Sequence, residues 1–485
     1  MRPNVLFITL DQFRGDCLSV AGHPLVRTPN LDRLAANGVR FARHYSQASP
    51  CAPGRASLYT GMYQMNHRVV ANGTPLNSSF DNIALAARRG GYVPTLFGYT
   101  DQSIDPRVTD GPEDERLQSY EGVLPGFESH VDLTRNYDAW RHYLASLGCD
   151  SSGTVQELLS TENLRPLDAS VSTFMTNEVL SWINQQESGW FAHVSYIRPH
   201  PPYSAAGEFS TMYSPADVGL PIERAEEVHA FHEVMLNLDG TKAPTDAEEL
   251  AHLRAQYFGM ISEVDYQLGR LWDYLVTSGE WDNTIIVVTA DHAELLGDHG
   301  LREKVGYWET SQHILGIARD PRYPQQFGTV VEKFTENVDI MPTLCELIGV
   351  DVPAQCDGRP LTSFITGSEV SWWRDAAHWE YDWRFALIPF DKHHWPHNRR
   401  LEHMNLAVRR SETHAYVQFG DGDYLCFDLQ ADPHWRITTD DPVVVSREAR
   451  AMLTWRMEHA NRSHTGFLVE KGGIGRWPDG VAWRT

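Results

Sequence analysis

Short apolar runs alternate with amphipathic stretches along most of the chain. Val5–Leu10, Trp190–Tyr196 and Ile285–Thr289 are nearly all apolar, as expected of strands buried inside a covered sheet. Leu31–Asn37 and Leu250–Leu275 instead carry apolar residues at three-to-four spacing, which predicts amphipathic helices. This alternation predicts an α/β fold with a mainly parallel sheet and helical crossovers.

Further elements fit the same pattern. Thr28-Pro29-Asn30 has the character of a helix entry, and Gly38 marks the exit of that helix. We also predict strands at Val39–Phe41 and Tyr92–Phe97, and helices at Asn82–Arg89 and Val338–Ile348. Residues 106–187 are rich in Gly, Ser and Asp, and we interpret them as insertions over the sheet edge.

The pattern changes after about residue 373. Short strand-like runs joined by polar turns replace the alternation, and a final amphipathic helix is predicted at Ser446–Asn461. The predicted strands are Phe385–Ile388, Leu406–Val408, Ala415–Phe419 and Tyr424–Phe427. We therefore expect a catalytic α/β domain over residues 1–375, followed by a C-terminal subdomain and tail over 376–485, with a small antiparallel sheet and a helix.

Composition and charge narrow the possible partners. The 485 residues are 42% hydrophobic, as in soluble globular proteins, and carry a formal net charge of −23. A nucleic-acid partner would call for a basic stripe, so the acidic balance argues against one. An anionic substrate would have to be attracted locally, by a metal ion or by a few cations in a pocket.

Six cysteines are scattered through the chain without a C-x-x-C pair, so a disulfide framework is not expected. The chain begins on a strand-like run rather than a signal peptide, and no run of 18 apolar residues predicts a membrane span. The simplest expectation is a cytoplasmic protein with reduced thiols and no membrane partner.

Two predicted strands end in an acidic residue followed by a second polar residue. Val5–Leu10 continues into Asp11-Gln12, and Ile285–Thr289 continues through Ala290 into Asp291-His292. Ligands of open α/β sheets bind beyond the carboxyl ends of strands, so these four side chains are expected to converge on one metal ion. Each pair taken alone is explained as well by a turn or a helix cap.

Residues 51–61 read Cys-Ala-Pro-Gly-Arg-Ala-Ser-Leu-Tyr-Thr-Gly. Taken alone, C-x-P-x-R is matched about equally well by a free cysteine in a turn before a helix. The longer string resembles the signature of the sulfatase family. In that family the cysteine is oxidised to formylglycine by a maturation enzyme, and the aldehyde hydrates to a diol.

Other segments extend the resemblance to nearly the whole chain, most weakly at 107–187. They include Asn4–Gln12, Tyr196–Pro202, Gly297-Asp298-His299, Lys304–Tyr307 and Glu380–Arg384. Together they resemble the sulfatase branch of the alkaline phosphatase superfamily, and within it the bacterial phosphonate monoester hydrolases, which also cleave phosphodiesters. The resemblance implies a sheet sandwiched by helices and a homo-oligomer that hydrolyses small anionic esters.

Roles carry over to matching positions. Cys51 would be the formylglycine nucleophile and Arg55 would orient its diol. His200 and Lys304 would assist the leaving oxygen, and Asn72, Tyr99 and Asp101 would lie at the substrate. The metal ligands would be Asp11, Gln12, Asp291 and His292. One diol hydroxyl would attack phosphorus or sulfur and expel the alcohol; loss of a proton from the other would break the C–O bond and release the acid.

Four positions depart from the relatives that the sequence resembles. Typical sulfatases, which bind calcium, have Asp at position 12 and Asn at 292; Gln12 and His292 favour Mn²⁺, with Ca²⁺ as the alternative. Asp101 replaces a threonine of the phosphonate hydrolases, and a carboxylate there would repel anions unless it turned away or met a cation. Ala293 stands where glycine is usual.

Alternatives remain at this point. Aryl sulfates carry the same charge of about −1 as phosphonate monoesters and phosphodiesters, so an arylsulfatase is the second hypothesis. A non-catalytic sulfatase-fold binding subunit and a phosphatase relative with a Ser or Thr nucleophile are the others. His200 could simply pack between its prolines. The His393-His394-Trp395-Pro396-His397 cluster fits a solvated loop better than a second metal site.

Overall fold

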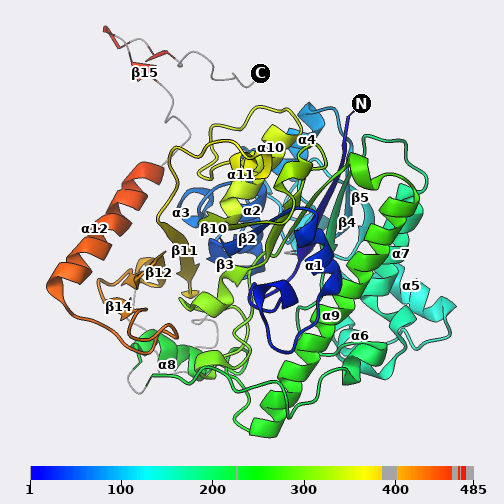
Figure 1. Ribbon diagram of the computed structural model, residues 1–485, viewed down its shortest axis with the longest axis horizontal. Helices are drawn as coiled ribbons and strands as arrows, with labels where there is room; N and C mark the ends of the chain where they lie inside the picture. Colours follow the sequence, from blue (N-terminus) through cyan, green and yellow to red (C-terminus); the bar gives the residue numbers. More distant parts are fainter. Residues whose placement is uncertain are drawn as a thin grey trace.

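A nine-stranded mixed sheet forms the centre of the protein (Figure 1). The computed structural model describes residues 2–119, 121–225, 228–384, 401–460, 468–469, 471–473 and 475–476. The strand order is β10 (Thr329–Glu336), β2 (Val39–Tyr45), β9 (Gly316–Arg319), β7 (Thr284–Thr289), β1 (Asn4–Leu10), β6 (Phe191–Tyr196), β4 (Pro94–Gly98) and β5 (Glu128–Asp132); β8 (His313–Ile314) pairs with β2.

Most neighbours in this sheet are parallel. β1 lies between β7 and β6 in parallel register, with Ile8 opposite both Val288 and Val194. β8 and β9 are the antiparallel members. The expectation of a mainly parallel α/β sheet is confirmed, and its antiparallel strands fall in a region where no strand was predicted.

Both faces of the sheet are covered, which explains why β1 is apolar at almost every position. The described α-helices are α1 (Pro29–Ala36), α2 (Cys51–Thr60), α3 (Gln64–His67), α4 (Ile83–Arg89), α5 (Asp138–Ser146), α6 (Val155–Ser160), α7 (Val171–Ile183), α8 (Ala230–Leu236), α9 (Ala247–Thr277), α10 (Ile340–Leu347), α11 (Thr362–Thr366) and α12 (Pro442–His459). Leu6, Ile8 and Leu10 pack into a core with helices α1, α7 and α9. Val5 and Phe7 pack into the opposite core, with α2, α4 and α10.

Local details of two helix starts differ from one another. Asn82 caps α4, because its side chain accepts from the backbone N–H groups of Ala84 and Leu85. Thr28 makes no such side-chain bond at the start of α1, where Pro29 instead supplies the preset backbone angle of a first helical residue.

The weakly patterned segment 106–187 is more than an insertion over the sheet. It supplies the edge strand β5, which pairs with β4, and the helix α7, whose buried Phe174 and Val179 join the main core. The interpretation of this segment as insertions was therefore incomplete. Its polar composition hid one short, mostly exposed strand.

A second, five-stranded sheet has the order β14 (Tyr424–Asp428), β13 (His414–Phe419), β12 (Asn405–Ser411), β11 (Ala376–Asp382) and β3 (Ala48–Ser49), with α12 packed on β12 and β13 (Figure 1). β11 was not predicted. Two short strands farther on, β15 (Leu468–Val469) and β16 (Gly475–Arg476), pair with each other. The predicted strand Phe385–Ile388 and the cluster His393–His397 lie outside the described residues.

We propose a domain division near residue 375, because β11 starts at Ala376. The two parts are interlocked, because β3 comes from the N-terminal part and pairs with β11 of the C-terminal part. β3 ends at Ser49, and a single residue separates it from Cys51. All six cysteines are described, and none of them forms a disulfide. Among the described helices, none combines the length and the apolar character that a membrane crossing requires.

Candidate active site

Cys51 is the first residue of α2 and is only 4% exposed. The next residue, Ala52, is held on both sides: its N–H donates to Asn72 Oδ1 at 2.9 Å, and its carbonyl accepts from Gln102 Nε2 at 2.9 Å. The start of the helix is therefore fixed by side chains from two separate loops. This places the side chain of residue 51 at a defined point beyond the sheet.

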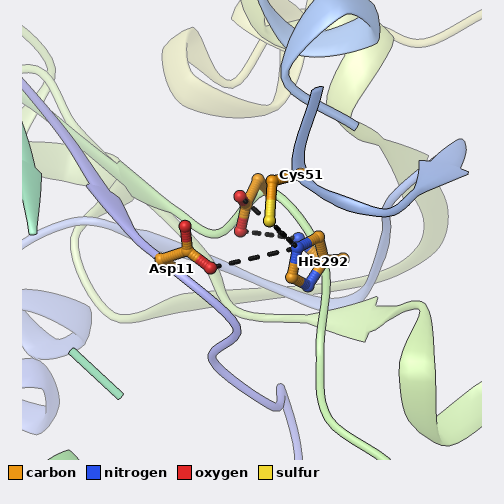
Figure 2. A group of neighbouring side chains, drawn as sticks. Asp11, Cys51 and His292 are labelled. Carbon is orange, nitrogen blue, oxygen red and sulfur yellow. Dashed lines mark hydrogen bonds and ion pairs between the residues drawn. The ribbon is translucent and has the colours of Figure 1, made fainter. Parts of the chain in front are cut away.

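Four side chains predicted from the sequence converge at this point. Figure 2 shows Asp11, Cys51 and His292 directed toward one another. Ligand atoms of Asp11, Cys51, Asp291 and His292 all lie within 4.8 Å of one another, and all four residues are buried. They come from the ends of β1 and β7 and from the start of α2, as the strand-end argument predicts.

These residues fit a bound cation. Asp11 Oδ1 is buried and accepts no hydrogen bond from the described residues, a costly arrangement unless another group satisfies it. Burial, and then the nearby Lys304, lower the pKa of His292 to about 3, so its imidazole is neutral and able to ligate a metal. Two carboxylates, an imidazole and residue 51 make a mixed oxygen–nitrogen donor set.

The two carboxyl groups respond differently to burial. Burial, followed by repulsion from Asp11, raises the pKa of Asp291 to about 6. Burial acts on Asp11 in the same direction, but His200 and Arg55 outweigh it and hold the pKa of Asp11 below its usual range. A divalent cation between the two would favour the ionised form of both.

Arg55 connects the carboxylates and is completely buried. Its Nε donates to Asp291 Oδ2 and its Nη2 to Asp11 Oδ2, both at 2.9 Å. Its Nη1 donates to Ser195 Oγ at 2.8 Å. All three guanidinium nitrogens are thus bonded to protein groups, so in this structure Arg55 orients the two carboxylates.

The side-chain amide of Gln12 lies beside the candidate metal site and is held in one orientation by hydrogen bonds. Its Nε2 donates to Glu294 Oε2, which leaves Oε1 to accept from Lys304 Nζ at 2.7 Å. Its backbone φ is 68°, an uncommon value for a residue other than glycine, and its N–H donates to Asp291 Oδ1 at 3.1 Å. The amide oxygen predicted to bind metal is therefore presented beside Lys304.

Lys304 and His200 form a direct pair. Lys304 Nζ lies 2.8 Å from His200 Nε2, and His200 Nδ1 lies 2.6 Å from the carbonyl oxygen of Pro201. Nδ1–H donating to Pro201 and Nε2 accepting from the ammonium group is the arrangement that satisfies both contacts. His200 thus does more than pack between its prolines.

The residues predicted to lie at the substrate have specific partners. Asn72 is exposed and holds Ala52, as described above. The Tyr99 hydroxyl donates to Asp11 Oδ2 at 2.7 Å. Asp101 is 5% exposed with φ 51°, and its Oδ2 lies 3.5 Å from Arg55 Nε. The extra carboxylate has therefore met a cation, one of the two outcomes that would limit its repulsion of anions.

The Cys51 thiol is not activated as a nucleophile. Burial, reinforced by Asp11 and Asp291 against the opposing effect of Lys304, raises its pKa well above the usual range. Reactive cysteines have lowered pKa values, because the thiolate is the attacking form. A thiol at this position gains chemical use only if it is converted to another group.

Three supporting residues were not predicted from the sequence. Glu294 accepts from Gln12 Nε2, from the Tyr203 hydroxyl and from the backbone N–H groups of Leu296 and Glu303. Ser195 accepts from Arg55, and Arg198 holds the His200 loop. The available signals were an acidic residue three positions after Asp291 and a serine inside an otherwise apolar strand.

Comparison with known proteins agrees with this geometry. The sulfatase family model matches residues 3–350, and a model for the C-terminal region of N-sulphoglucosamine sulphohydrolase matches residues 297–436. The chain belongs to the sulfatase family. The family and the alkaline phosphatase-like fold expected from the sequence are confirmed.

The chain is similar to three characterised or solved relatives. It is 34% identical to PehA of Trinickia caryophylli, a multifunctional alkaline phosphatase superfamily protein, over 98% of this chain and 99% of the relative. The crystal structure of a phosphonate monoester hydrolase of Agrobacterium radiobacter has 39% identity and a TM-score of 0.89, over 98% of this chain and 100% of that one. An arylsulfatase of Clostridium perfringens is 26% identical over 89% of each chain.

Proposed function

We propose that this protein hydrolyses singly charged esters, with phosphonate monoesters and phosphodiesters first and sulfate esters as additional substrates. The observation that carries the proposal is the position of residue 51, at the start of a buried helix and within 4.8 Å of ligand atoms from three side chains that could hold a metal. Higher identity to a phosphonate monoester hydrolase than to an arylsulfatase favours the order of substrates.

Charge balance supports a substrate with a single negative charge. Arg55 is bonded to Asp11, Asp291 and Ser195, so its charge is largely committed within the protein. Among the residues that the structure describes, Lys304 is the remaining cation that acts on Cys51. One ammonium group and a divalent ion suit a monoanion better than a dianion, because the site also contains at least two carboxylates.

We propose that Asp11, Asp291 and His292 hold a divalent metal, with Gln12 Oε1 as a fourth ligand beside Lys304. When bound, the metal would acidify a hydroxyl of residue 51 and offset the charge of the ester. We favour Mn²⁺ over Ca²⁺, because calcium sites are built from oxygen ligands and His292 supplies nitrogen. The neutral imidazole of His292 is consistent with this choice.

Conversion of Cys51 to formylglycine by a maturation enzyme is part of the same proposal. The hydrated aldehyde would offer one hydroxyl for attack and a second whose deprotonation expels the bound acid by C–O cleavage. The inactive character of the buried thiol supports the need for this conversion. Because Cys51 is 4% exposed, we expect the maturation enzyme to act before the chain has folded.

Lys304 and His200 are proposed to serve the leaving oxygen. Lys304 Nζ donates to His200 Nε2, and His200 is partly exposed while Asn72 is fully exposed. Those two residues mark the side from which an ester would approach. A positioned proton donor contributes roughly 10²–10⁴-fold to rate, most strongly when the alcohol is a poor leaving group.

The experiment that tests the function is a side-by-side comparison of kcat/KM for an aryl phosphonate monoester, an aryl phosphodiester and an aryl sulfate carrying the same phenol. Cys51→Ala serves as the matched control for contaminating hydrolases. Highest kcat/KM with the phosphonate or diester supports the first assignment. Highest kcat/KM with the sulfate makes the protein an arylsulfatase, and turnover of none of them favours a binding subunit.

We also propose a cytoplasmic location for the protein. Six cysteines without a disulfide among them are consistent with a cytoplasmic protein. We propose a homo-oligomer with the C-terminal segment as a contact, which sedimentation velocity would test.

A further inference from the structure

The loop that carries His200 is fastened from beneath by a buried arginine. Arg198 has no exposed surface, and it lies in the segment that follows β6. Its Nη1 donates to two backbone carbonyls of its own loop, that of His200 at 2.8 Å and that of Pro202 at 2.9 Å. A single nitrogen therefore joins the backbone carbonyl of the histidine to the carbonyl two residues later.

The other guanidinium nitrogens anchor Arg198 to a different part of the chain. Nε donates to Glu162 Oε2 at 2.9 Å, and Nη2 donates to the same oxygen and to the carbonyl of Leu159 at 3.0 Å. Glu162 is completely buried, and its second oxygen accepts from the N–H of Val171, the first residue of α7. The anchor is thus tied to a core helix.

We propose that Arg198, fixed by Glu162, is a positioning residue that sets the place of His200 relative to Lys304 and the leaving oxygen. The inference rests on the proposed function, because it assigns His200 to the leaving group. It also connects the weakly patterned segment 151–170 to the reaction, because Glu162 lies in that segment. Within the described part of the chain, the hydrogen bonds of the His200 ring go to Pro201 and Lys304, so the position of the ring depends on that of its own loop.

The planar guanidinium is suited to this task. It delivers five N–H donors in a fixed fork, and here those donors serve Glu162 and three carbonyl oxygens together. A lysine would keep the charge beside Glu162 but could not span all of these acceptors. Arg198→Lys should therefore loosen the loop while leaving the buried acid neutralised.

The test compares the para-nitrophenyl and the phenyl ester of one phosphonic acid in the formylglycine-containing, metal-loaded enzyme. Phenoxide is the poorer leaving group and depends more on a proton donor. Because His200 Nε2 accepts from Lys304 Nζ, a shift of the His200 loop displaces this proton donor. The displacement is expected to lower kcat/KM for the phenyl ester by about 100-fold, the cost of a movement near 1 Å, and for the nitrophenyl ester by less than about tenfold. In a His200→Ala background, Arg198→Lys should add less than about threefold for either ester, because both changes act through one side chain.

A matched control comes from the same segment. Arg165→Lys removes a guanidinium that donates to Leu158 and Thr161 instead of to the His200 loop. This substitution should change kcat/KM for the two esters by the same factor. Glu162→Gln is the second variant if Arg198→Lys folds poorly, since it keeps the shape of the anchor. Circular dichroism and Tm confirm that each variant is folded before its kinetics are compared. Glu162→Gln is expected to show the same larger loss of kcat/KM for the phenyl ester than for the nitrophenyl ester.

The possible results distinguish a failure of the Arg198 positioning role from a failure of the proposed function. An equal loss for both esters in Arg198→Lys, or full additivity with His200→Ala, overturns the positioning role while the proposed function stands. If His200→Ala itself slows both esters equally, the leaving-group role of His200 is wrong and the inference falls with it. If the parent enzyme cleaves neither ester, the proposed function fails first.

Discussion

Lys304 Nζ lies 2.8 Å from His200 Nε2 and 2.7 Å from Gln12 Oε1, so one ammonium group joins the predicted metal ligand to the predicted leaving-group residue. Because the pair acts as a unit, we expect Lys304→Met and His200→Ala each to lower kcat/KM for a phenyl ester by roughly 10²–10⁴-fold. The double variant should cost no more than about threefold beyond the worse single variant.

A double-mutant cycle with purified, metal-loaded enzymes measures this coupling. Arg302→Met removes a neighbouring cation that donates to the carbonyl of Asp239, away from His200, and serves as the control for lost charge. Losses that multiply fully would show that Lys304 and His200 act on separate steps.

Replacement of the predicted nucleophile should remove most activity. Cys51→Ser retains a hydroxyl at the start of α2 but cannot form a hydrated aldehyde, so the C–O cleavage exit is lost. Mass spectrometry of the tryptic peptide should show formylglycine or its hydrate in protein co-expressed with a maturation enzyme. Cys149→Ser, at a free and partly exposed cysteine, should keep wild-type activity. Wild-type turnover by Cys51→Ser would mean that the mechanism is wrong.

One divalent ion per chain should accompany activity. Asp291→Asn keeps the shape of a completely buried side chain but removes a charged ligand, and should lower metal content and reduce kcat/KM by at least roughly 100-fold. Asp265→Asn alters a buried carboxyl that accepts from the backbone of Asn30 and Leu31, so it should leave metal content unchanged. Elemental analysis decides both points, and an active enzyme free of metal contradicts the assignment.

Much of the fold could be predicted because its signals are local. β1 and β7 are short apolar runs, and the polar residues that end them sit where parallel strands gather ligands. β3 escaped prediction because two residues carry no periodicity, and its strand character comes from β11, more than 300 residues later in the chain. The sheet that steadies the residues before Cys51 is thus a product of tertiary pairing.

Some residues of the candidate site could likewise be recognised from the sequence, and others could not. Asp11, Cys51 and Asp291 have chemistry that can be recognised from residue type and neighbours. Glu294 and Arg198 act through contacts with distant segments, Gln12 in one case and Glu162 in the other. A lone acid or arginine in the sequence does not reveal such a partner, because most charged residues lie on solvated surfaces.

A buried acid beside the Arg198 anchor should make stability depend on pH. Burial, and then the nearby Glu162, raise the pKa of Glu263 to about 7. Since the folded state then holds its proton more tightly than the unfolded chain, the stability from this group is present at low pH and is lost as pH rises through 7. Glu263→Gln, which has no such ionisation, should match wild type near pH 5 and be more stable by on the order of 1–3 kcal/mol near pH 9.

Thermal unfolding at the two pH values measures the difference. Glu178→Gln, at a half-buried position on α7, is the control for replacement of a glutamate by glutamine. A Tm for Glu263→Gln that is lower than wild type at both pH values would show that the carboxyl is ionised and stabilising in the folded protein.

Asp101 should govern the basic side of the pH–rate profile. Burial raises its pKa to about 8, although Arg55 opposes the rise, and a bound divalent cation would move it lower. Below that pKa the carboxyl is neutral; above it, a second negative charge faces the anionic ester. At about 6 Å and an effective dielectric near 20, two unit charges repel by roughly 3 kcal/mol. Wild-type kcat/KM for aryl phosphonates and diesters should therefore fall as the carboxyl ionises.

Asp101→Asn preserves the shape of the side chain without its charge, and Asp101→Thr introduces the residue that the resemblance to phosphonate hydrolases leads us to expect. Both variants should keep kcat/KM within about twofold of wild type on the acidic side and exceed it on the basic side, by more at low salt than at high salt. Because Asp101 Oδ2 also lies 3.5 Å from Arg55 Nε, a loss of activity at every pH would mean that the carboxylate is needed to hold the guanidinium. Profiles parallel to wild type with unchanged rates would show that Asp101 carries no charge effect on the ester.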